Sequence, residues 1–129
     1  MSKARELANL RGTPTDNNVL LHSLAGDAIT AGSGTYNVAV GANAFGAGTT
    51  GDDNIAIGQT ALAAATIGLR NIAIGCGAMA TAVGGQADNN IAIGLGTLAG
   101  HADMSGNDNI AIGQAAADIL TTGACNIAM

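Results

Sequence analysis

A chain of 129 residues could form one ordinary domain, but this one has no tryptophan, one tyrosine and one phenylalanine, so a thick globular core is difficult to build. Its net charge of −5, with eight of the nine acidic residues in the body of the chain, argues against nucleic-acid binding, which needs a basic face. No stretch is apolar enough to cross a membrane, so we expect no membrane insertion.

The first 17 residues differ from the rest of the chain. Residues 1–11 carry a net charge of +2, whereas the remainder carries −7. The apolar spacing predicts a short amphipathic helix or an extended anchor, ended by a linker around Pro14. So short a helix is marginal alone and needs a partner surface. We therefore interpret residues 1–17 as a docking segment and linker, whose candidate docking residues are Lys3, Arg5, Leu7, Leu10 and Arg11.

The remainder of the chain, residues 18–129, is organised by one repeated phrase, Asn-Ile-Ala-Ile-Gly or its valine variant. Successive copies begin 17 or 19 residues apart, as in 54 − 37 = 17 and 90 − 71 = 19. Residues 18–36 are a divergent first repeat, and the last copy is cut short at Met129. A fixed period near this length predicts a solenoid.

Alternation within the phrase places Ile55 and Ile57 on one side of a strand and Asn54, Ala56 and Gly58 on the other. Neither side is charged, and a strand of this kind is normally buried on both faces. We therefore predict an all-β fold, a parallel β-solenoid or β-roll of 17 to 19 residue coils, assembled as an intertwined or side-by-side homotrimer. The alanine-rich stretches that follow the phrase are expected to be a weaker strand or an irregular return, not a helix.

Two further features of the repeat carry structural expectations. A glycine lies three residues before most of the repeated asparagines, where we expect a turn with positive φ; these glycines are Gly34, Gly51, Gly68, Gly106 and Gly123. The two cysteines, Cys76 and Cys125, occupy different repeat positions, so we expect two reduced thiols in small apolar sites and no disulfide.

The repeated asparagines are expected to stack as a structural amide ladder; they are Asn37, Asn54, Asn71, Asn90, Asn109 and Asn126. The functional alternative is an ion held where three such columns meet. The aspartates before Asn54, Asn90 and Asn109 could bind calcium, but we interpret them as caps of their own turns. His22 and His101 are isolated and are expected to be surface residues. No nucleophile or carboxylate pair has a histidine partner, so we expect no catalytic site, no metal, no cofactor and no enzyme activity.

The repeated phrase, with a small residue such as Ala44 or Ala61 at position eight, resembles the head repeats of trimeric autotransporter adhesins. In those proteins the chain winds as a left-handed parallel β-roll and three chains assemble around one axis. The longer period, with Gly-x-x-Asn joining the copies, looks even more like repeat regions of bacteriophage tail fibres. The opening residues 1–10 are similar to the first residues of many tail-fibre and virion-attached phage proteins.

This resemblance implies a structural tail-fibre component that is made in the host cytoplasm and resides in the virion. The amino-terminal segment would dock on other tail or virion proteins, the repeats would form a trimeric shaft, and the host receptor would be bound by other parts of the fibre. We expect residues 1–129 to be the amino-terminal part of a longer fibre. Two alternatives stay open, which are the head of a trimeric bacterial surface adhesin and a monomeric ligand-binding solenoid.

Overall fold

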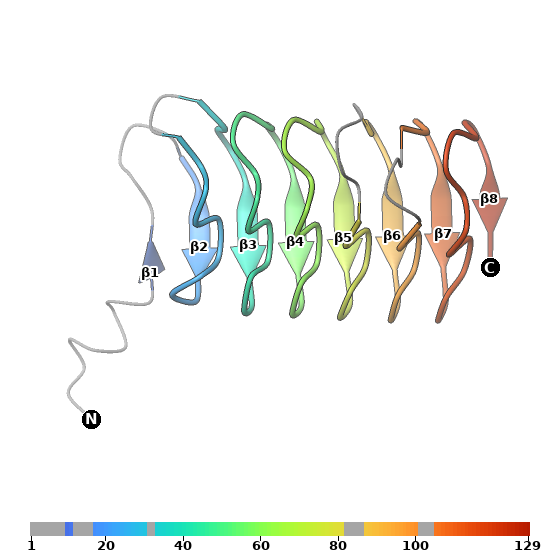
Figure 1. Cartoon of the computed structure of the whole chain (residues 1–129), viewed down its shortest axis with the longest axis horizontal. Helices are drawn as coiled ribbons and strands as arrows, with labels where there is room; N and C mark the ends of the chain where they lie inside the picture. Colours follow the sequence, from blue (N-terminus) through green and yellow to red (C-terminus); the bar gives the residue numbers. More distant parts are fainter. Residues whose placement is uncertain (1–9, 12–16, 31–32, 82–86, 101–104) are drawn as a thin grey trace.

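The computed structural model describes residues 10–11, 17–30, 33–81, 87–100 and 105–129. Within them the chain winds as a parallel β-solenoid whose strands lie side by side along the long axis of the molecule (Figure 1). The strands are β1 (Leu10–Arg11), β2 (Val19–Leu21), β3 (Val38–Val40), β4 (Ile55–Ile57), β5 (Ile72–Ile74), β6 (Ile91–Ile93), β7 (Ile110–Ile112) and β8 (Ile127–Ala128). The predicted all-β parallel β-solenoid is confirmed.

The repeated phrase sets the register of the sheet. Strands β2 to β8 are parallel and pair in chain order, so that Val38 aligns with Ile55 and Ile72 aligns with Ile91. These two pairs are separated by 17 and 19 residues, and both keep alanine opposite alanine. An insertion of two residues in the return loop preserves the inward and outward alternation of the next strand.

The amino-terminal edge of the sheet is covered by β1, which pairs antiparallel with β2 through Leu10 opposite Leu21. Of the two alternatives for this segment, the extended one holds at Leu10 and Arg11 and the helix does not, because the free edge of β2 offers backbone groups that a short strand can satisfy and a short helix cannot. The other three candidate docking residues, Lys3, Arg5 and Leu7, lie outside the described residues.

The return between strands is a series of turns, which confirms the irregular alternative for the alanine-rich stretches. In the coil that follows β4, the backbone N–H of Ala61 bonds within its own turn to the Gly58 carbonyl, at 3.3 Å. The next N–H, that of Leu62, bonds to the Ala78 carbonyl of the following coil at 2.9 Å. Because alternate N–H groups are committed to neighbouring coils, stacking overrides the helix propensity of the alanines.

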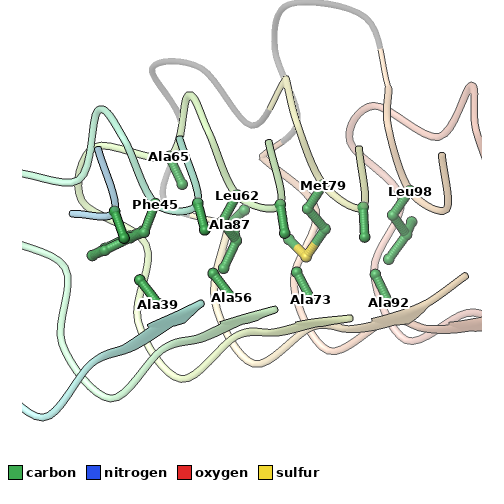
Figure 2. Close-up of a cluster of buried hydrophobic side chains, with 14 of the residues drawn as sticks. Ala39, Phe45, Ala56, Leu62, Ala65, Ala73, Met79, Ala87, Ala92 and Leu98 are labelled. Carbon is green, nitrogen blue, oxygen red and sulfur yellow. The ribbon is translucent and has the colours of Figure 1, made fainter. Parts of the chain in front are cut away.

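The core is a thin layer between the strands and the returns (Figure 2). Alanines at the centre of strands β3 to β6, such as Ala56 and Ala73, face one large apolar residue from each of the returns that follow these strands. These large residues are fully buried and are Phe45, Leu62, Met79 and Leu98. All four have positive φ between 47° and 50°, an uncommon conformation for bulky side chains that their burial stabilises.

The glycines before the asparagines serve a purpose that differs from the expected one. Positive φ is found at Gly34 but not at Gly51, Gly68, Gly106 or Gly123, so the expectation is wrong for those four. What they provide is room between coils. A Cβ added at Gly68 would lie 2.7 Å from the Ala87 carbonyl oxygen, and one at Gly106 would lie 2.1 Å from that of Gly123.

Candidate interaction surface

The repeated asparagines form a continuous hydrogen-bonded ladder inside the solenoid. The Asn71 amide nitrogen Nδ2 donates to Asn54 Oδ1 at 3.2 Å and to the Ala87 carbonyl at 2.6 Å. Its Oδ1 accepts from the backbone N–H of Asn90 at 3.0 Å and from Asn90 Nδ2 at 3.2 Å. Every hydrogen-bonding group of this buried amide is therefore used, and each link joins one coil to the next.

The same pattern runs the length of the column. The members from Asn37 to Asn109 are at most 1% exposed, whereas Asn126 is exposed. Because these amides point into the coil and are saturated within one chain, asparagine columns from three chains cannot meet. This geometry argues against the alternative of an ion held between three columns. The contacts of the buried amides join one coil to the next.

A second set of side chains ties the coils together at the turn before each strand. Asp52 Oδ1 accepts from the backbone N–H of Thr35 at 2.6 Å, and Asp88 Oδ1 accepts from that of Leu69 at 2.9 Å. The prediction that these aspartates cap turns is confirmed for Asp52 and Asp88. The predicted location is wrong, because each caps the turn of the preceding coil and not its own. Within the described residues no three histidine, cysteine or acidic side chains lie close enough to hold a metal ion.

Sequence reasoning missed these contacts between coils, although a signal was present. Thr35 and Asp52 are separated by 17 residues, and Leu69 and Asp88 by 19, which are the two repeat lengths. A polar side chain in one coil and the same repeat position in the preceding coil are therefore neighbours. The buried hydroxyl of Thr97 is satisfied in a related way, since it donates to the Gly113 carbonyl of the next coil at 2.5 Å.

The two cysteines and His22 stand apart from the core. Both thiols are free and exposed, so the expected apolar sites are wrong. The physical reason is their position, because Cys76 and Cys125 occupy the corners where the strand joins a turn and faces solvent. His22 is also exposed, and its Nδ1 accepts from the backbone N–H of Leu24 at 3.4 Å. His101 lies outside the described residues.

The side of the sheet that faces away from the core is apolar, and no residue in the described ranges covers it. We call it the outer sheet face. It consists of the two outward residues of each strand from β2 to β7 and the one of β8, which are Val19, Leu21, Val38, Val40, Ile55, Ile57, Ile72, Ile74, Ile91, Ile93, Ile110, Ile112 and Ile127. Ile57 and Ile93 are each 37% exposed, and Ile112 is 43% exposed. Parallel sheets are normally covered on both faces, so this face is the candidate interaction surface.

No family model, curated protein or solved structure matches this chain. In the part of the chain that the structure describes, no helix has the length and apolar character to span a membrane. A continuous strip of β-branched side chains offers an apolar surface for packing, and its polar groups are confined to the two borders of the sheet.

Proposed function

We propose that this chain is a structural, non-enzymatic segment of a bacteriophage tail fibre. Residues 18–129 form a stiff shaft from three copies of the chain, and residues 1–17 dock on a tail or virion protein. Host attachment takes place through other parts of the fibre. The observation that carries this proposal is the outer sheet face, whose apolar strip runs from β2 to β8 and is covered by none of the residues that the structure describes.

Three copies would remove this strip from water by turning their outer sheet faces toward a common axis. Burial of apolar surface is the main favourable term in such an association, at about 25 cal/mol per Å². The shape of the solenoid suits the arrangement, because every strand is short and presents the same two outward positions at each level. The resemblance of the repeats to tail-fibre and adhesin repeats supports the choice of three copies.

Stiffness follows from the contacts already described. Each coil is joined to the next by strand hydrogen bonds, by bonds between returns and by the buried asparagine ladder. Bending the shaft would stretch several of these bonds at once, and each buried amide left without a partner costs about 1–3 kcal/mol. A polar interior that is used entirely for links between coils fits a mechanical role.

One pair of substitutions tests whether the outer sheet face is buried between copies of the chain. Ile57 and Ile67 are both 37% exposed, but Ile57 lies on the outer sheet face and Ile67 lies in a return. We expect Ile57→Lys to abolish the trimer, because it would place three ammonium groups in the shared apolar core. Ile67→Lys should leave the trimer intact. Sedimentation equilibrium measures both, and equal behaviour of the two variants would contradict the proposal.

A further inference from the structure

The outer sheet face has two borders whose residues match in chemistry or in size at three of its strands, β3, β4 and β7. The starting border consists of the residue before each repeated asparagine, and the finishing border of the residue after the glycine of the phrase. Taken from β3 to β7, the residues at the two ends of each strand are Tyr36 and Ala42, Asp53 and Gln59, Arg70 and Cys76, Asn89 and Leu95, and Asp108 and Gln114.

The complementarity is clearest at β4 and β7. The finishing border of these strands holds the only two glutamines of that column, and the starting border of the same strands holds Asp53 and Asp108. A glutamine amide donates hydrogen bonds that a carboxylate accepts. At β3 the large Tyr36, which is 59% exposed, shares a strand with the small Ala42.

Within one chain the matched groups do not meet, and at β7 Asp108 Oδ1 accepts instead from Asn89 Nδ2 of the preceding coil, at 3.1 Å. Asp53 and Gln59 lie at opposite ends of β4, on the order of 15–20 Å apart at the rise of an extended strand. Among the residues that the structure describes, neither side chain has a hydrogen-bond partner. The matched groups can meet only when one border of a copy approaches the other border of a second copy.

We propose that the copies join head to tail in register, with the starting border of each copy against the finishing border of the next. This inference rests on the proposed trimer and specifies its contacts. When three outer sheet faces surround one axis, the strands of each level form the sides of a triangle. The beginning of each strand then lies beside the end of its neighbour, and the contact closes into a ring. Asp53 accepts from Gln59 of the neighbouring copy, and Asp108 accepts from Gln114.

Other arrangements lose these pairs. A shift of one coil would place Asp53 against Ala42 or Cys76 and would remove both carboxylate–amide pairs. A two-fold arrangement whose axis runs along the strands would place each border against a copy of itself, and one about the shaft axis would keep the pairs only in a dimer, which its mass distinguishes from a trimer. The register is therefore testable apart from the existence of the trimer.

A charge exchange tests the pair at β4. We expect Gln59→Glu to raise about ten-fold the protein concentration at which half of the chains are trimeric, because two carboxylates would face each other across the contact. The double variant Asp53→Gln/Gln59→Glu exchanges the two groups and should restore assembly to near that of the original chain. Failure of the double variant to recover would overturn the register.

Cross-linking gives an independent test in a chain that carries Cys76→Ser and Cys125→Ser. Oxidation of the added pair Asp53→Cys/Gln59→Cys should produce a covalent trimer, whereas Asp53→Cys/Gln114→Cys should not. If the uncross-linked chain sediments as a monomer, both the proposed trimeric shaft and the proposed head-to-tail contacts are contradicted. If the chain is a trimer and both cysteine pairs cross-link equally, only the register is overturned. Cross-linking of Gln59→Cys alone would indicate a two-fold contact and would also overturn it.

Discussion

Replacement of Asn71 by alanine is expected to lower the free energy of unfolding by about 2–5 kcal/mol. The substitution removes the acceptor of the Asn90 backbone N–H and the donor to the Ala87 carbonyl, both of which lie in the buried ladder. The loss should be visible as a lower midpoint in urea unfolding. Because assembly contributes to stability, the variant and the original chain must be compared at one protein concentration.

The matched control for this prediction is Asn126→Ala. Asn126 belongs to the same column, but it is exposed, so its loss should cost less than about 1 kcal/mol. A third variant, Asn71→Asp, keeps the acceptor atoms and loses the donor. Its loss of stability reports the contribution of the hydrogen bond to the Ala87 carbonyl. Equal losses in Asn71→Ala and Asn126→Ala would contradict the structural role of the ladder.

The loss of stability caused by substitutions of Leu62 is expected to depend on the shape of the new side chain as well as on its size. Leu62 is fully buried and has φ of 50°, and the next coil has Met79 at the equivalent position with the same φ. Leu62→Met should therefore cost less than about 1.5 kcal/mol. Leu62→Ala should cost about 2–5 kcal/mol because it empties the layer between strand and return.

The variant Leu62→Ile separates the effect of backbone conformation on stability from the effect of side-chain volume. A β-branched residue is strongly disfavoured at positive φ, so Leu62→Ile should cost about 1–3 kcal/mol more than Leu62→Met. Leu69→Ile is the control, since Leu69 is half-buried and does not have positive φ. Unfolding of the variants at one concentration measures the difference. If Leu62→Ile were as stable as Leu62→Met, the positive φ at this position would place no demand on side-chain shape.

Sequence reasoning reached the solenoid and its register because both depend on local alternation and on a repeated phrase. Asn54, Ala56 and Ile57 take the sides of the strand that a period of two assigns to them. The alanines in the returns could have been mistaken for helix, and only the strand-like character of the phrase argued otherwise.

What could not be predicted depends on contacts between residues one coil apart. The need for glycine at Gly68 comes from the nearby carbonyl of Ala87, which no local rule reveals. The positive φ of Leu62 is similarly invisible, because leucine gives no sign of that conformation in a sequence. The strand at Leu10 depends on the open edge of β2 and not on its own short pattern.

The most direct test of the shared outer sheet face is the mass of the unmodified chain in solution. One copy has a mass of 12.4 kDa, so sedimentation equilibrium should find a species near 3 × 12.4 = 37.2 kDa. The same species should dissociate on dilution, with a melting temperature that rises with protein concentration. A folded species of 12.4 kDa at all concentrations would contradict the trimeric shaft, because the apolar strip from β2 to β8 would then be stable in water without a partner.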